Sequence, residues 1–428
     1  MAIEKISFSD VQKAYDSALL LADRHYIKIV TASVLANQLV GNPVWLMLVA
    51  ASSGGKTAVL LTLNDLEFLP GKPVTFFVSD LTENTLASGF KSGGGDSSLL
   101  SQLPYGGILI FKDFTSLLTK RREARDAIMG QLREVFDQQF DKRTGNKQDL
   151  AWNGKAGSLA GVTTAVHEYM GNMAVMGDRF VMYSIVQPDR MKLLRFVMDM
   201  KLQGDSQTEY LAKAKKTMHA YLKGCLPLAK EARLHMNSED REHLMFVADF
   251  STKVRSGVIT NERTNQVEFV PDPEMPTRLI DQLLSIGTAL SLMHKVDGEA
   301  EELTKDDMDI LYKIAFDSIP IKRRWALREL ATYVRGATTA GLATKIGYET
   351  SVVKSWLAQL NALGICRRIG GSGADVWLLN DEYVDIMRTF EKIKEKEGVL
   401  VDENATPDDL LAEEALMDFG DIDSEEFK

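Results

Sequence analysis

The stretch Val49-Ala50-Ala51-Ser52-Ser53-Gly54-Gly55-Lys56-Thr57 decides the fold, because it joins an apolar run at 45–49 to a second apolar run that begins at Ala58. This order predicts a strand, a glycine-rich loop and a helix. Backbone N–H groups of such a loop can surround a β-phosphate, the Lys56 ammonium can reach the β- and γ-phosphates, and the Thr57 hydroxyl can ligate Mg²⁺. The sequence therefore predicts a site for ATP and Mg²⁺ that is contacted by Ser53, Gly54, Gly55, Lys56 and Thr57.

One position of this phosphate loop departs from the usual pattern. Ala50 stands where G-x-x-x-x-G-K-[ST] has its first glycine, whereas the part that contacts phosphate, Gly54 to Thr57, is intact. The alternative interpretation is a glycine-rich turn in which Lys56 and Thr57 occur by chance. The strand before the loop and the helix after it favour the nucleotide site.

Further apolar runs, at 74–78, 108–111 and 158–162, alternate with helical segments and predict an α/β fold with a mainly parallel sheet. The second run ends in Lys112-Asp113, where a carboxylate can hold the Mg²⁺ shell or polarise an attacking water. The alternative for Asp113 is a cap at the strand end. The third run ends in Thr163-Thr164, and we expect Thr164 to face the γ-phosphate.

A helix at 120–140 and a hairpin at 140–155 are predicted between the second and third of these strands. The hairpin has a turn at Gly145-Asn146-Lys147 and a basic outer surface, to which Lys142, Arg143, Lys147 and Lys155 contribute.

Charge is distributed unevenly along the 428 residues, whose net charge is −10. The acidic residues gather after residue 401, so the remainder of the chain is close to neutral and can carry basic patches. No long apolar run predicts a membrane span, and the first residues lack the pattern of a signal peptide, so we expect a cytoplasmic protein. The two cysteines, Cys225 and Cys366, predict neither a disulfide framework nor a zinc site.

The order of these elements resembles the AAA+ ATPases, and within them the motor domain of minichromosome maintenance helicases. The likeness rests on Leu132 to Gln139, on Lys155-Ala156-Gly157 and on Met176-Gly177-Asp178-Arg179-Phe180. It implies that Lys155 and the basic hairpin touch DNA in a central channel, and that Arg179 completes the ATP site of a neighbouring subunit. It also implies a sensor role for Thr164 and for Arg278, and a homo-oligomeric ring, a hexamer in this family. The alternative for Arg179 is an ordinary surface ion pair.

The C-terminal part has a different pattern. Three helical segments between 321 and 362 precede two short strands joined by a glycine-rich tip, and this pattern resembles a winged helix. In the DNA-binding interpretation Lys354 faces a groove while Arg367 and Arg368 meet phosphates. The alternative is a winged helix used for protein contacts. The acidic tail beyond is expected to be a disordered, solubilising segment or a peptide that docks on a replication protein.

The expected architecture is an AAA+ parallel-sheet ATPase core with a helical lid, a winged-helix domain and an acidic tail. The expected function is a ring-forming, DNA-binding ATPase, either a helicase or a helicase-loading remodeller, in the replication of a phage or mobile element. The alternative is a nucleotide-switched DNA-binding regulator or defence factor with little turnover; a metabolic phosphotransferase is disfavoured. The expected boundaries are a helical lead-in at 1–40, the core at 41–205, the lid at 206–318, the winged helix at 319–397 and the tail at 398–428.

Overall fold

The computed structural model describes residues 6–52, 54–82, 85–86, 91–92, 95–96, 98–143, 149–169, 179–204, 206–261, 263–264, 266–370 and 374–396. The chain forms two units. The first comprises Met1–Arg255 and Glu274–Pro320, and the second comprises Ser256–Pro273 and Ile321–Lys428. The segment 256–273, which the sequence assigned to the lid, thus belongs to the second unit. The acidic tail lies outside the described residues.

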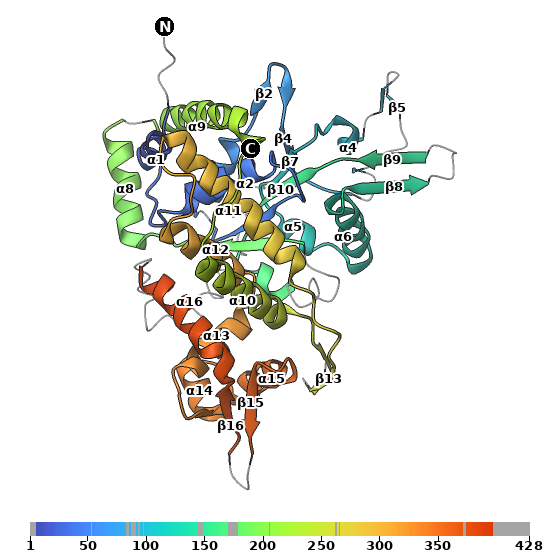
Figure 1. Ribbon diagram of the computed structural model, residues 1–428, viewed down its shortest axis with the longest axis vertical. Helices are drawn as coiled ribbons and strands as arrows, with labels where there is room; N and C mark the ends of the chain where they lie inside the picture. The colour runs from blue at the N-terminus through green and yellow to red at the C-terminus, as the bar shows by residue number, and fades with distance from the viewer. Residues whose placement is uncertain are drawn as a thin grey trace, which may run out of the picture. The chain divides into compact units, whose positions relative to one another are not determined.

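A five-stranded sheet, parallel throughout, is the centre of the first unit (Figure 1). Its strand order is β11-β1-β10-β7-β4, so β10 separates the phosphate-loop strand β1 from β7. Every residue of the three central strands is buried, as expected for parallel strands covered on both faces. The predicted parallel α/β core is confirmed. Its strands are β1 Trp45–Val49, β4 Thr75–Val78, β7 Gly107–Phe111, β10 Ala156–Val162 and β11 Val181–Ser184.

Alternation along the strands directs side chains to the two faces of the sheet. On one face Trp45, Met47 and Val49 pack against apolar residues of α5 Thr115–Leu118 and α6 Arg122–Phe136. On the other face α2 and α3 approach β10 closely: a Cβ added to Gly157 would lie 2.3 Å from Asn37 Cγ, and one added to Gly161 would lie 3.3 Å from Leu60 Cδ1. Glycine is therefore required at position 157.

Two helices, α1 Phe8–Asp16 and α2 Tyr26–Ala36, precede the sheet, and five follow it in the first unit. Ten of the eleven residues of α2 are buried, because α2 packs against helices that come much later in the sequence. The later helices are α8 Arg190–Leu202, α9 Gln207–Ala229, α10 Ser238–Arg255, α11 Thr277–Asp297 and α12 Lys305–Asp317.

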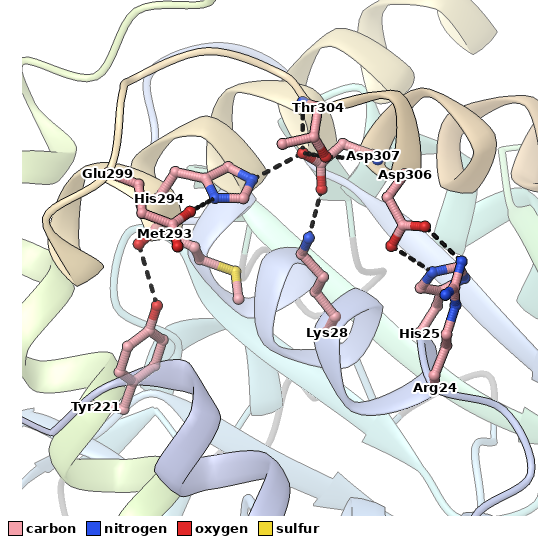
Figure 2. A network of polar contacts seen from close by, with 10 residues as sticks. All are labelled: Arg24, His25, Lys28, Tyr221, Met293, His294, Glu299, Thr304, Asp306 and Asp307. Carbon is pink, nitrogen blue, oxygen red and sulfur yellow. Dashed lines mark hydrogen bonds and ion pairs between the residues drawn. The ribbon is translucent and has the colours of Figure 1, made fainter.

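A polar network ties α2 to α11 and α12 (Figure 2). At its centre is Asp307, which is fully buried and accepts hydrogen bonds from Lys28 Nζ at 2.6 Å and from His294 Nε2 at 2.7 Å. The other ring nitrogen of His294 lies 2.6 Å from Glu299 Oε2. Because both groups of each pair can carry a charge, these bonds are strong, and the network fixes α11 and α12 to α2.

The predicted hairpin is confirmed as β8 Gln139–Arg143 and β9 Asp149–Asn153, which pair antiparallel and project from the sheet beside α6 (Figure 1). Shorter elements of the first unit are α3 Lys56–Leu61, β2 Glu67–Leu69, β3 Lys72–Pro73, β5 Lys91–Ser92, β6 Gly95–Asp96 and α4 Leu99–Gln102.

The second unit combines helices with a three-stranded antiparallel sheet in the order β14-β16-β15. Its core contains Leu327, Leu342, Val353 and Leu357. The expected helices and the two strands of the predicted wing are present. The elements are β12 Ile259–Thr260, β13 Val267–Phe269, α13 Ile321–Ala331, β14 Ala337–Thr338, α14 Thr339–Ile346, α15 Thr350–Ala362, β15 Cys366–Ile369, β16 Val376–Leu379, a 3₁₀ turn Asp381–Tyr383 and α16 Val384–Lys396.

Candidate functional site: two opposite edges of the sheet

The phosphate loop lies at the carboxyl edge of the sheet, between β1 and α3. Gly55 has a φ of 78°, which is a left-handed conformation, and it directly precedes the first residue of α3. Glycine adopts that conformation without steric cost, so the loop can turn sharply into the helix. Gly54 and Gly55 are partly exposed and Thr57 is exposed, whereas Ser53 lies outside the described residues.

Lys56 is buried against the loop that precedes it. Its Nζ donates hydrogen bonds to the carbonyl oxygens of Ala50 at 2.5 Å and Ala51 at 2.7 Å. Burial lowers the pKa of Lys56 to about 8, against a smaller opposite effect of the Asp113 carboxylate. The Lys56 ammonium therefore has two neutral carbonyl oxygens as acceptors. A charged phosphate oxygen could replace them and would form a stronger hydrogen bond with the ammonium.

Gln187 also reaches the phosphate loop, and the sequence did not single it out. It follows β11, and a Cβ added to Gly54 would lie 2.6 Å from Gln187 Oε1. Gln187 Nε2 donates to the carbonyl oxygen of Ile185 at 3.2 Å, which holds the side chain over the loop. Three segments therefore meet at this edge: the ends of β1 and β11 and the start of α3.

Asp113 follows β7 at the same edge and is exposed. Its Oδ1 accepts a hydrogen bond from the backbone N–H of Thr115 at 2.9 Å. Lys56 begins α3 after the loop that follows β1, and Asp113 follows β7, so both groups lie at the carboxyl edge of this parallel sheet. In this arrangement Asp113 also has the capping role that was the alternative interpretation.

The polar end of β10 is held by Thr163 and Thr115. The backbone N–H of Thr163 donates to Thr115 Oγ1 at 3.2 Å, and the two hydroxyl oxygens are 3.4 Å apart. Thr164 follows in a turn, where its carbonyl oxygen accepts from the N–H of His167 at 3.1 Å. Thr163 therefore has the closer link to the Asp113 segment, and Thr115 is a neighbour that the sequence reasoning missed.

The donors expected for Mg²⁺ are Thr57 and Asp113. Within the described part of the chain no group of three or more His, Cys, Asp or Glu side chains is placed to hold a metal ion. The two oxygen donors Thr57 and Asp113 fit Mg²⁺ better than zinc. Protein-bound Mg²⁺ commonly keeps several waters and takes one or two protein oxygens together with phosphate oxygens.

Arg179 lies at the opposite, amino edge of the sheet. Val181 pairs with Leu46 in the parallel register, so Arg179 is level with Val44, before β1 begins. Six residues of extended chain separate that level from Ala50, which corresponds to about 20 Å. The Arg179 guanidinium therefore cannot reach the phosphate loop of its own chain.

Three arginines gather at the amino edge. Arg179 Nη2 is 3.1 Å from Asp137 Oδ2, Arg278 Nη1 is 3.5 Å from Glu274 Oε1, and Arg255 Nη2 is 3.0 Å from Glu274 Oε2. Burial lowers the pKa of Arg278, Glu274 raises it, and the positive charges of Arg179 and Arg255 lower it further. The guanidinium groups are therefore close enough to repel one another.

Gln282 links β1 to Arg179 at the amino edge, and the sequence pattern did not indicate this role. It is buried, its Oε1 accepts from the N–H of Trp45 at 2.9 Å, and its Nε2 donates to the carbonyl oxygen of Arg179 at 3.0 Å. Gln282 comes one helical turn after Arg278 on α11, so both project from the same face. It therefore fixes Arg179 relative to Arg278 and to the start of β1.

The predicted DNA contact of Lys155 is wrong, because the Lys155 side chain is fully buried. Its Nζ donates to the carbonyl oxygens of Ala36 at 3.2 Å and Leu39 at 2.7 Å, and burial lowers its pKa to about 8. Ala36 is the last residue of α2 and Leu39 follows the helix, and the last carbonyls of a helix lack intrahelical donors. Lys155 is thus a buried cap of α2 and is not available to DNA.

For the other basic candidates of the hairpin the structure gives less. It places the backbone of Lys142 and Arg143 in β8 but does not describe their side chains. Lys147 falls between the two strands and is likewise outside the described residues.

In the second unit, Asp375 engages two of the three predicted DNA contacts. Lys354 Nζ is 3.0 Å from Asp375 Oδ2, and Arg368 Nε is 2.7 Å from Asp375 Oδ1. The hydrogen bonds from Lys354 and Arg368 lower the pKa of Asp375. Arg367, on the same strand as Arg368, is exposed. A phosphate at Lys354 or Arg368 would therefore have to compete with Asp375.

No helix within the described ranges is long and apolar enough to cross a membrane. A scan of the chain against models of protein families finds no match, and a search of curated proteins finds none either.

Proposed function

We propose that this chain binds and hydrolyses ATP and that a complete hydrolytic site needs two copies of the chain. The observation that carries the proposal is the separation of two sets of groups on one sheet. Lys56 and Asp113 lie at the carboxyl edge, while Arg179 and Arg278 lie at the amino edge, where Gln282 links α11 to Arg179 and Trp45. An arginine in such a pair stabilises charge on a phosphoryl group only where a second copy brings its amino edge to the phosphate loop.

Each of this chain's groups has a role in that scheme. Lys56 exchanges its carbonyl partners for phosphate oxygens, and the backbone N–H groups of the loop and the start of α3 orient the β-phosphate. Asp113 orients the attacking water or the metal shell, and Thr163 and Thr115 keep its segment in place. A bound Mg²⁺, held by Thr57 and Asp113, would neutralise charge on the phosphates. Arg179 and Arg278 of the other copy meet the terminal phosphate.

DNA is the proposed partner of the assembled ring, as in the AAA+ helicases that the sequence resembles. The hairpin β8–β9 and the exposed Arg367 are the supporting features, and the helices and antiparallel strands of the second unit are compatible with a winged helix. Because Lys155 is buried, the hairpin contact would come from Lys142, Arg143 and Lys147. The proposed activity is that of a helicase or helicase-loading remodeller in the replication of a phage or mobile element.

The test is ATP hydrolysis by the purified chain, with and without single-stranded or forked DNA. We expect measurable turnover that DNA stimulates, and we expect Lys56→Ala to abolish it because the phosphates lose their main side-chain cation. Lys215→Ala is the matched control, since Lys215 forms an exposed ion pair with Asp65. Absence of turnover under every condition would reject the proposal.

One observation favours a second candidate, a nucleotide-switched DNA-binding regulator. Asp113 already accepts a hydrogen bond from the backbone N–H of Thr115, and Lys112 rather than a second acid stands beside it. Under this candidate ATP binds and changes DNA affinity, while turnover stays near the background rate. ATP-dependent DNA binding by the wild-type chain without turnover above the background rate would favour the switch, whereas DNA-stimulated turnover that Asp113→Asn abolishes would favour the hydrolase.

A further inference from the structure

The amino edge contains an arginine that the proposed function does not use. Arg255 is only 3% exposed, and its Nη2 donates to both oxygens of Glu274, at 3.1 Å and 3.0 Å. Its Nε and Nη1 are also buried, and among the described residues neither has a hydrogen-bond partner. A buried N–H donor without a partner costs about 1–3 kcal/mol, so such groups call for a physical reason.

Arg255 belongs to a cluster of arginines. Within the part of the chain that the structure describes, Arg179, Arg255 and Arg278 lie near the carboxylates of Asp137 and Glu274. Glu274 is shared between Arg255 and Arg278. Guanidinium groups bind phosphate through paired N–H donors, and the unused Nε and Nη1 of Arg255 are donors of that kind.

Arg255 and Glu274 also occupy a special position in the chain. The chain leaves the first unit after Arg255 and returns at Glu274, and residues 256–273 between them belong to the second unit. The Arg255–Glu274 ion pair therefore joins the two points where the chain leaves the first unit and returns to it, which we call the base of the excursion 256–273.

We propose that Arg255 is a third arginine of the site for the terminal phosphate of ATP bound to a second copy of the chain, and that Glu274 is the built-in anion that this phosphate displaces. The inference rests on the proposed function, which already assigns Arg179 and Arg278 to that phosphate. Exchange of Glu274 for phosphate lets the state of the nucleotide act on the base of the excursion.

The Arg255→Lys variant separates this role from a purely structural one. Lysine keeps the ion pair with Glu274 but lacks the planar set of donors. We expect the variant to keep the thermal stability of the wild type and to lose at least about tenfold in kcat for ATP, because a single charge-stabilising donor is commonly worth a factor of that size or more. Arg328→Lys is the control, since Arg328 pairs with Glu391 in the second unit. Wild-type kcat in Arg255→Lys would overturn the inference.

Mixing two chains that are impaired at different places tests whether the arginine cluster acts on another copy. The Lys56→Ala chain keeps the three arginines but lacks the phosphate-binding lysine. The Arg255→Gln chain keeps that lysine but lacks Arg255. We expect equal amounts of the two chains to hydrolyse ATP faster than the sum of the rates that the two show separately. If Arg255→Gln does not fold, as circular dichroism would reveal, Arg255→Lys takes its place. A rate no higher than the sum of the separate rates, where the wild type hydrolyses ATP, would reject the role of Arg255 while leaving the proposed function intact.

The Glu274→Gln variant gives an effect of opposite sign. Removing the competing carboxylate leaves the arginines freer to bind phosphate, so we expect kcat/KM for ATP to rise by about threefold or more, while the melting temperature falls because Arg255 loses its charged partner. A fall in kcat/KM that parallels the loss of stability would show that Glu274 and Arg255 are only structural.

Discussion

At the scale of single residues, Lys155 joins two parts of the first unit. Lys155 directly precedes β10, and its buried ammonium binds the carbonyl oxygens of Ala36, which ends α2, and of Leu39, which follows that helix. We expect Lys155→Ala to lower the free energy of unfolding by about 2–4 kcal/mol, because a long buried side chain and two hydrogen bonds are lost together. Denaturant unfolding followed by circular dichroism measures this. Lys215→Ala, an exposed control, should change it by less than about 0.5 kcal/mol.

The same variant distinguishes a structural lysine from a DNA contact. If Lys155 acts only through stability, the affinity of the folded variant for DNA and the salt dependence of that affinity stay as in the wild type. A loss of one phosphate contact would instead reduce the slope of log K against log salt by about one. Such a reduction at unchanged stability would contradict the buried position.

Residues of this kind mark the limit of prediction from sequence. Lys56 was predicted because the loop around it has a local pattern that needs lysine at that position. Lys155 follows a basic hairpin, and its spacing does not say whether its side chain turns outward or inward to α2, which precedes it by more than a hundred residues. Arg255 and Glu274 meet only because the chain returns after the excursion, and no periodicity in the sequence indicates that pairing.

At the scale of elements, the network in Figure 2 makes the attachment of α11 and α12 to α2 depend on pH. Both ring nitrogens of His294 face carboxylates, and two hydrogen bonds to carboxylates need the imidazolium form. The hydrogen bond and charge of Asp307, and the hydrogen bond of Glu299, raise the pKa of His294, while burial and Lys28 act in the opposite direction.

The sign of the pH effect follows from that direction. Because the folded pKa lies above the unfolded value of about 6.5, the contribution of His294 to stability is complete below that pH and is lost as the pH rises through the folded pKa. We expect His294→Gln to lower the free energy of unfolding by about 1–3 kcal/mol at pH 6 and by less at pH 9. Unfolding curves at the two pH values check this, with the exposed His235→Gln as control. A loss that is equal at both pH values would contradict it.

Helix α8 is an element with an unusual exposure. None of its residues is buried, and Met191, Leu194, Met198 and Leu202 are exposed at helical spacing on one side, at the edge of the first unit in Figure 1. We expect the double variant Leu194→Ser, Met198→Ser to change the free energy of unfolding by less than about 1 kcal/mol. The buried Leu290→Ala on α11 should cost about 2–5 kcal/mol. A large loss from the α8 variant would show that its apolar side is packed within the chain.

The elements themselves were more predictable than their partners. Buried parallel strands consist of continuous apolar runs, so 108–111 and 158–162 could be recognised, and the glycine-rich tip indicated the pair β15 and β16. The assignment of 256–273 to the second unit depends on tertiary packing. Short strands such as β12 and β13 have too few residues for a pattern to show where they belong.

At the scale of the whole molecule, the sheet presents one half of the proposed ATP site at each edge. Lys56 and the arginine cluster of one chain are separated by the length of the strands, so the proposed function requires contact between copies for turnover. We expect the ATPase rate per chain to rise with protein concentration and to reach a plateau where assembly is complete. Analytical ultracentrifugation with and without ATP should place the assembly transition in the same concentration range.

Arg179→Ala provides the matched variant for this last prediction. It keeps the phosphate loop and removes the side chain that would meet the other copy's phosphate, so ATP binding should persist while the rate per chain stays low at every concentration. The loss should be about a thousandfold if Arg179 acts as such an arginine commonly does. If Arg179 serves only its ion pair with Asp137, the variant should instead keep the wild-type rate and its dependence on concentration. A wild-type rate per chain that is independent of concentration, measured where the protein is monomeric, would show that a single chain contains the whole site.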